Sequence, residues 1–214
     1  MNSWVSEVIA EPCNMQKTVD ESIIDGVMSG LIRQNDTAEE RFVPKLISNQ
    51  PGSTMGDAIR EELKGSESFD ISVAFVSENA LKSMYQAFVD HAKKSGKRNR
   101  IITSTKNYFN SPKAFKELMK LQRDANVEVL IWEHGDSGES GGTIAQDQLF
   151  HPKGYLFTRR MEEGRAYYNL YVGSSNLTSF ALQNQREWNL RVSSTSEAQL
   201  IQQVKEELAD QVRQ

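Results

Sequence analysis

The chain has 214 residues, which is enough to bury a hydrophobic core and fits one domain with an N-terminal extension. Its formal net charge of -4 argues mildly against a protein that coats nucleic acid through bulk positive charge. No apolar run approaches the roughly 20 residues that span a bilayer, and the N-terminus lacks a secretory signal pattern. Cys13 is the only cysteine, which excludes an internal disulfide and a cysteine-based zinc cluster. We therefore expect a cytoplasmic protein that does not bind a membrane.

The first part of the chain differs in pattern from the rest. Apolar residues recur at helical spacing over residues 18–35, so we expect an amphipathic helix there. Prolines and a glycine then interrupt regular structure over residues 41–53. We expect an N-terminal helical extension over residues 1–43 and a single domain over residues 44–214.

Helices and strands alternate in the first half of the expected domain. The expected helices cover residues 54–65, 78–96 and 111–124, and the expected strands cover residues 69–77, 100–105 and 127–132. This alternation is typical of an α/β fold whose strands run parallel.

The second half of the expected domain contains more strands than helices. A loop rich in glycine, serine and aspartate is followed by strands over residues 149–157, 166–175 and 187–194 and by a C-terminal amphipathic helix over residues 196–214. We expect a hairpin between the first two of these strands and a helical turn between the last two. The sequence thus predicts an α/β domain with a mixed, largely parallel β-sheet flanked by helices.

A histidine stands two residues before a lysine at two places in the chain. Residues two apart point to the same face of a strand, whereas on a helix they diverge by about 200°. His91 and Lys93 lie in an expected helix and cannot converge on one ligand. His151 and Lys153 lie in an expected strand and can face one pocket. The alternative for His151 and Lys153 is a histidine with a satisfied hydrogen bond and a lysine that extends to water.

Polar residues at the same spacing occur in the next two expected strands. Ser174 and Asn176 end one strand, and Glu187, Asn189 and Arg191 share one face of the next. Buried strands normally carry apolar residues at such positions, and burying polar groups is costly unless they bind each other or a ligand. Their concentration favours a binding or catalytic site over a structural role.

The side chains at these positions suit a phosphate group. Lys153 and Asn176 offer a cation and a fixed donor to phosphate oxygens, and Ser174 with the backbone of Gly173 adds further donors. A carboxylate such as Glu187 can orient His151 and make it a better nucleophile. No acidic cluster with magnesium spacing accompanies them, so the predicted chemistry is attack on phosphorus without a metal or another cofactor.

The segments "HPK" and "GSSN" resemble the H-x-K and G-S-x-N signature of the phospholipase D superfamily. Over residues 44–208, the chain is similar to the phospholipase D-like domain near the N-terminus of certain bacterial DEAD/DEAH-type helicases. The resemblance implies that His151 is a nucleophile forming a covalent phosphohistidine. It also implies that Lys153 and Asn176 bind phosphate, that Ser174 assists them, and that Glu187 orients the histidine. Gly173 and Ser175 belong to the same signature and are predicted to support it.

The resemblance has one departure and one consequence. The aspartate that the superfamily carries a few residues after the lysine is missing, which makes lipid head-group transfer a weaker prediction. The superfamily brings two motifs together so that a second histidine protonates the leaving oxygen, and this chain has one credible copy. We therefore expect a homodimer with both His151 side chains at the twofold interface. Otherwise another residue serves as the acid, and His134 is the candidate.

Three functions compete on the sequence alone. The first is a metal-independent phosphodiesterase that cuts nucleic acid, with DNA favoured, as a module of a helicase-linked protein. The second is a non-catalytic module of the same fold that binds nucleic acid or docks a partner for a helicase. The third, a lipid phosphodiesterase, is disfavoured because no basic amphipathic helix is present. The intact set of His151, Lys153, Asn176 and Glu187 favours the first function.

Overall fold

The computed structural model describes residues 40–105, 110–133, 150–162 and 164–213. Cys13, His134 and the helix expected over residues 18–35 lie outside the described residues. The chain divides into two units, residues 1–43 and residues 44–214. In the first unit, the structure describes a short 3-10 helix, η1 (Glu40–Phe42). All that follows concerns the second unit.

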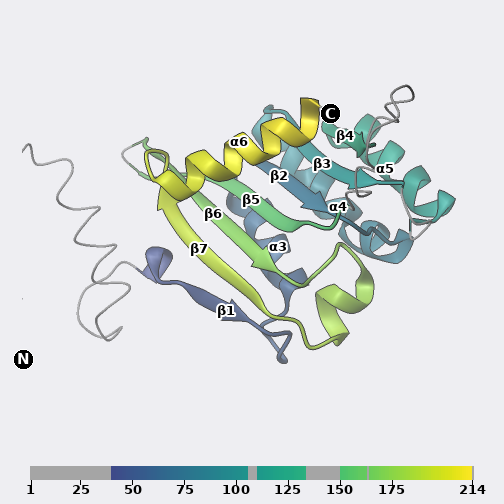
Figure 1. The fold of residues 1–214 in the computed structure, drawn as a ribbon, viewed down its shortest axis with the longest axis horizontal. Helices are drawn as coiled ribbons and strands as arrows, with labels where there is room; N and C mark the ends of the chain where they lie inside the picture. Colours follow the sequence, from purple (N-terminus) through teal and green to yellow (C-terminus); the bar gives the residue numbers. More distant parts are fainter. Residues whose placement is uncertain (1–39, 106–109, 134–149, 163, 214) are drawn as a thin grey trace, which may run out of the picture. The chain divides into compact units, whose positions relative to one another are not determined.

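A seven-stranded sheet forms the centre of this unit, with the strand order β1-β7-β6-β5-β2-β3-β4 (Figure 1). The strands are β1 (Lys45–Ile47), β2 (Ser68–Val73), β3 (Asn99–Ser104), β4 (Val127–Trp132), β5 (Lys153–Arg160), β6 (Ala166–Gly173) and β7 (Asn189–Thr195). The helices are α3 (Met55–Gly65), α4 (Glu78–Ser95), α5 (Pro112–Asp124), the π-helix η3 (Phe180–Asn184) and α6 (Gln199–Arg213).

The sheet combines a parallel half with an antiparallel half. Strands β2, β3 and β4 pair in parallel, and α4 and α5 make the crossovers between them. The other four of the six pairings are antiparallel. The predicted α/β class and mixed sheet are confirmed, but the sheet is not largely parallel. The reason is that β5, β6 and β7 follow one another without a full crossover helix, and parallel neighbours need such a crossover.

Helices cover the two faces of the sheet unequally, as Figure 1 shows. Helices α3, α4 and α5 pack on one face and bury the larger core, whose members include Ile59, Met84, Phe88 and Leu118. Helix α6 crosses the other face and buries a smaller core through Ile201 and Leu208, which pack with residues of β3, β4, β5 and β6. The site described below therefore rests on a sheet that is packed from both sides.

Helices α3, α4 and α5 begin within a residue of the predicted positions, and each has a side chain that caps its N-terminus. The hydroxyl groups of Thr54, Ser77 and Ser111 accept hydrogen bonds from backbone N–H groups of the first turns of α3, α4 and α5, at 3.0, 3.2 and 3.2 Å respectively. Helix α4 ends at Gly96, whose φ of 52° suits glycine. The caps of α4 and α5 fix where the helices that connect β2 to β3 and β3 to β4 begin.

His91 lies in the core of the domain, away from any surface site. Its two ring nitrogens lie 3.0 Å from the carbonyl oxygen of Leu63 and 3.1 Å from Oδ1 of Asn99. Its neighbour Lys93 is exposed and pairs with Asp90. The expectation that His91 and Lys93 share no ligand is confirmed, because one side chain points inward and the other points to solvent.

Candidate active site

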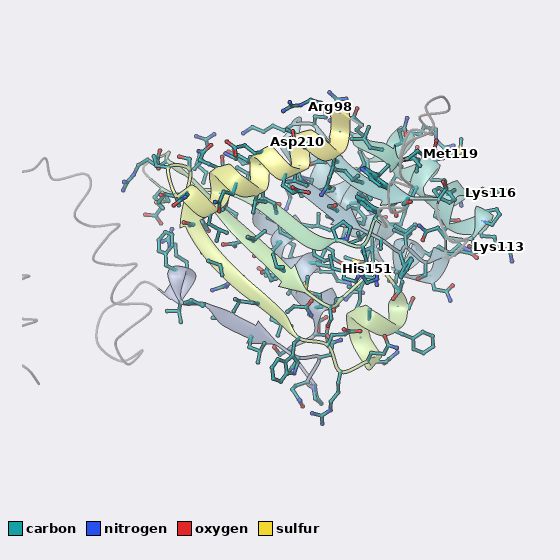
Figure 2. The ribbon with its side chains drawn as sticks, viewed as in Figure 1. Arg98, Lys113, Lys116, Met119, His151 and Asp210 are labelled. Carbon is teal, nitrogen blue, oxygen red and sulfur yellow. The ribbon has the colours of Figure 1, made fainter. Side chains whose placement is uncertain are left out.

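His151 lies just before β5, the central strand, at the end of the sheet where the neighbouring strand β2 finishes (Figure 2). The sequence predicted His151 inside a strand, but β5 starts only at Lys153, and the correction follows from Pro152, which has no N–H to donate to a ladder. The carbonyl of Pro152 accepts a hydrogen bond of 3.0 Å from the N–H of Ala74. This bond holds the His151 segment against the chain that leaves β2.

The imidazole of His151 and the ammonium group of Lys153 meet as predicted, although not through strand geometry. Lys153 Nζ lies 2.8 Å from Nδ1, 3.0 Å from Nε2 and 3.0 Å from the carbonyl oxygen of His151. The lone pairs of the two ring nitrogens diverge, so one ammonium cannot donate along both; it donates to the carbonyl and lies against the ring. An ammonium group and an imidazole ring therefore lie side by side at the surface.

Phe75 joins this pair to the next segment of the site. Its ring packs edge-on against the His151 ring, with centroids 5.8 Å apart and an interplanar angle of 73°. Its backbone N–H donates to Oδ1 of Asn176 at 3.1 Å, and its carbonyl accepts from the N–H of Leu177 at 3.1 Å. Because Oδ1 of Asn176 accepts this bond, the NH₂ group of the same amide is the donor left for a ligand.

His151, Lys153 and Asn176 therefore come together at the carboxyl end of β2, as the sequence predicted. Phe75, which holds them together, was missed. An aromatic residue just after a strand has no sequence feature that separates a site-building role from core packing. Only the pairing of the chain after β2 with the segment around Leu177 reveals its role.

Ser174 and Glu187 bind each other. The Ser174 hydroxyl donates to the Glu187 carboxylate and accepts from the N–H of Trp188 at 3.1 Å. Since a hydroxyl has one hydrogen, Ser174 as placed here has none left for a phosphate. The carboxylate that was predicted to orient His151 makes no bond to it among the described residues. A bond between Glu187 and His151, and phosphate binding by Ser174, therefore stay predictions.

The charge of Glu187 nevertheless acts on the site. Partial burial lowers the pKa of Lys153, and the negative charge of Glu187 opposes that shift. Burial also raises the pKa of Tyr155, and Glu187 raises it further. Tyr155 is fully enclosed and donates a hydrogen bond of 2.9 Å to the carbonyl of Ser175. The site thus carries one carboxylate whose field reaches the lysine ammonium.

The turn from Gly173 to Asn176 is held from beneath by Asn189. The buried Asn189 side chain accepts from the N–H of Ser175 at 3.2 Å and donates to its hydroxyl at 2.8 Å. A Cβ on Gly173 would lie 2.1 Å from the carbonyl oxygen of Trp188, so only glycine permits this close approach. Gly173 and Ser175 therefore support the site by shaping its backbone.

The arrangement suits a large anionic ligand. His151 is exposed and Lys153 and Asn176 are partly exposed, so the three groups face solvent at an open edge. Among the described residues, no group of three or more histidine, cysteine or acidic side chains is placed to hold a metal ion. No helix in the described ranges is long and apolar enough to cross a membrane.

Comparisons with known proteins agree with this fold. The family model described as "Cardiolipin synthase, PLD-like domain" matches residues 59–211. The solved structure of NucT from Helicobacter pylori is 16% identical, with a TM-score of 0.53, and the match covers 79% of this chain and 95% of that one. For Nuc from Salmonella typhimurium, a phospholipase D family member, the identity is 15%, the TM-score 0.55 and the coverage 80% and 94%.

At these identities, the NucT and Nuc structures show a shared fold alone. No curated protein sequence matches the chain. The expected link to a helicase finds no support in these matches. The family model covers well over half of the chain. The matched residues include six of the seven strands and the segments that carry His151, Lys153 and Asn176. The chain belongs to the family of phospholipase D-like domains.

Proposed function

We propose that this domain is a metal-independent phosphodiesterase that cuts nucleic acid, with DNA as the favoured substrate, through a covalent phosphohistidine. The observation that carries the proposal is the convergence of His151, Lys153 and Asn176 at one exposed edge of the sheet. An imidazole, a cation and an amide donor are the groups that attack on phosphorus needs. The resemblance in fold to NucT and Nuc supports the nuclease reading.

The proposed reaction proceeds in two displacements at phosphorus. A neutral ring nitrogen of His151 forms an N–P bond while the bond from phosphorus to the leaving oxygen breaks, and an acid protonates that oxygen. Water then attacks phosphorus while the group that acted as acid in the first step accepts a proton from the water; a P–O bond forms, the P–N bond breaks, and the phosphate end and the neutral imidazole are released. Lys153 and the NH₂ group of Asn176 stabilise the negative charge that the other phosphate oxygens carry in both steps.

The acid in the first displacement is proposed to be His151 of a second copy, which makes the protein a homodimer with the site at the twofold interface. The single motif supports this proposal, and the dimer is a testable expectation. Light scattering at tens of micromolar protein should give twice the mass of one chain. A mass of one chain across that concentration range would contradict it.

The metal-independent proposal predicts that cleavage survives chelation. Purified protein should cut single- and double-stranded DNA in EDTA at the rate seen in buffer with magnesium, because the positive charge at the site comes from Lys153 rather than from a metal ion. RNA and phosphatidylglycerol micelles serve as comparison substrates. Strict dependence on added magnesium would contradict the proposal. Cleavage of the lipid alone would show that the substrate is a lipid and not a nucleic acid.

One observation favours a second candidate, a module that binds nucleic acid or docks a partner without cutting. Glu187 is bonded to Ser174 and not to His151 in the described part of the chain, so the carboxylate that would orient the nucleophile is engaged elsewhere. Under this second reading, Lys153 and Asn176 bind a phosphate that is never attacked. Binding of DNA with no cleavage in either buffer would favour it. A link to a helicase remains a prediction from the sequence.

A further inference from the structure

Two large aromatic side chains beside the site are exposed to solvent. Trp188 is 72% exposed and Phe180 is 67% exposed. Side chains of this size and polarity are usually buried, and their exposure next to a polar site is a common mark of a binding surface. Neither residue has a role in the attack on phosphorus proposed above, so both require another explanation.

The backbone of Trp188 is fixed to the phosphate-binding turn. Its N–H donates to the hydroxyl of Ser174 at 3.1 Å, and its carbonyl accepts from the N–H of Ser174 at 3.1 Å. Two hydrogen bonds to one residue hold the backbone of Trp188 next to Ser174. The segment that carries the indole is thus ordered, and a ligand that stacks on the ring does not have to order a loop first.

Phe180 begins a second rigid segment that leaves the same turn. It is the first residue of η3, the lime-coloured helical turn beside the end of β6 in Figure 1. The helix follows Asn176 closely, because the N–H of Thr178 bonds to the carbonyl of Asn176 at 2.8 Å. The Asn49 side chain holds this segment by donating two hydrogen bonds, at 2.7 Å to the carbonyl of Ala181 within η3 and at 2.7 Å to the carbonyl of Gln185 just after it.

Two cations belong to the same region of the chain and the site. Arg186 is exposed and stands two residues before Trp188, and no ion pair or hydrogen bond of its side chain is found among the described residues. Lys153 lies at the site itself. Exposed aromatic rings that alternate with cations around a phosphate site are the arrangement that binds unpaired bases and their backbone.

We propose that Trp188 and Phe180 stack on unpaired bases next to the bound phosphate, which makes single-stranded nucleic acid the preferred ligand. The proposal rests on the proposed function, because it assumes that the site binds the phosphate of a nucleic acid. In a duplex, each base is covered on both faces by its neighbours, so a flat side chain reaches a base face only in a single strand, at an end or after unstacking.

A protein partner is the competing explanation for Trp188. Leu46, Leu190 and Val172 lie opposite one another across β1, β7 and β6, and they are 56%, 47% and 52% exposed. Trp188 precedes Leu190 by two residues and can extend this apolar row, which a second copy could cover. The row does not account for Phe180, which lies on a different element beside Asn176, or for the unpaired Arg186. Bases account for all three.

The test compares binding of two single-stranded oligonucleotides of equal length, one normal and one fully abasic, measured by fluorescence anisotropy in the non-cleaving His151→Ala background. Trp188→Ala in that background should weaken binding of the normal strand about fivefold or more, the lower end of what one stacked base contributes. Its affinity for the abasic strand should stay within about twofold, because the phosphates and cations are unchanged. Trp188→Phe should recover most of the loss, and Phe180→Ala should show the same selectivity for bases.

Met119→Ala is the matched control, because Met119 is 70% exposed on α5 and lies away from His151 (Figure 2). It should change neither affinity. Equal weakening of both strands by Trp188→Ala would overturn the proposal. A second result would also overturn it. If Leu46→Ala and Val172→Ala weaken strand binding as Trp188→Ala does, and also lower the mass measured by light scattering, the apolar row is a contact with a second copy. If the unsubstituted protein binds strands but cuts none, the proposed function fails while this result still decides the role of Trp188.

Discussion

Replacing His151 with alanine should reduce phosphodiester cleavage at least about a thousandfold, because no other group in the proposed reaction can form the covalent intermediate. The fold should be unaffected, since His151 is exposed and, in the described part of the chain, its ring interacts with Lys153 and the Phe75 ring at the surface. Steady-state cleavage of a labelled oligonucleotide measures the first quantity, and thermal unfolding measures the second.

The chain supplies its own control for this experiment. His91 and Lys93 have the same spacing as His151 and Lys153, but Lys93 lies on α4 and pairs with Asp90. Lys153→Ala should lose most of the activity with the fold intact, whereas Lys93→Ala should keep it. Undiminished cleavage by the His151→Ala protein would remove His151 from the reaction.

Replacing Glu62 with alanine should lower the free energy of unfolding by about 3–5 kcal/mol, the usual cost of leaving a buried charge without its partner. The Glu62 carboxylate on α3 is buried and accepts hydrogen bonds from Arg159 at 2.8 Å, Asn169 at 2.7 Å and Tyr171 at 2.7 Å. It thereby ties α3 to β5 and β6. Burial acts to lower the pKa of the Arg159 guanidinium, but the charge of Glu62 outweighs it and the pKa is raised. Burial and Glu62 both raise the pKa of the Tyr171 hydroxyl.

Denaturant unfolding of matched variants measures this contribution. Glu61→Ala removes the adjacent carboxylate of the same helix, which is 71% exposed and pairs with Lys64, so its loss should stay within about 0.5 kcal/mol. Glu62→Gln keeps the shape and an acceptor for Tyr171 and should fall between the two. A loss below about 1 kcal/mol for Glu62→Ala would show that the buried cluster contributes little net stability.

Local sequence signals were sufficient for the helices. The expected helices over residues 54–65, 78–96 and 111–124 agree with α3, α4 and α5 to within a residue, because their apolar spacing is a local signal. The direction of the strands was harder to predict. The expected hairpin gave the antiparallel pairing of β5 with β6, but the pairings of β5 with β2 and of β7 with β6 depend on which elements meet in space, and no local sequence signal shows them.

The sequence singled out residues that the fold brings close together, but it did not predict their contacts. Spacing and resemblance singled out His151, Lys153 and Asn176, which the fold brings together. Phe75 and Glu62 were missed because their roles depend on partners 76 and at least 97 residues away, respectively. The bond between Ser174 and Glu187 was missed for another reason: a hydroxyl and a carboxylate close together can satisfy each other as readily as a ligand.

The central claim is that His151 attacks phosphorus, and trapping the intermediate tests it most directly. Protein mixed with a labelled DNA strand and quenched in alkaline denaturant within the first turnover should carry a nucleotide adduct, which peptide mass spectrometry should place on His151. EDTA should not prevent the adduct, and the His151→Ala protein should form none. Efficient cleavage without any adduct, or an adduct on another residue, would contradict the mechanism.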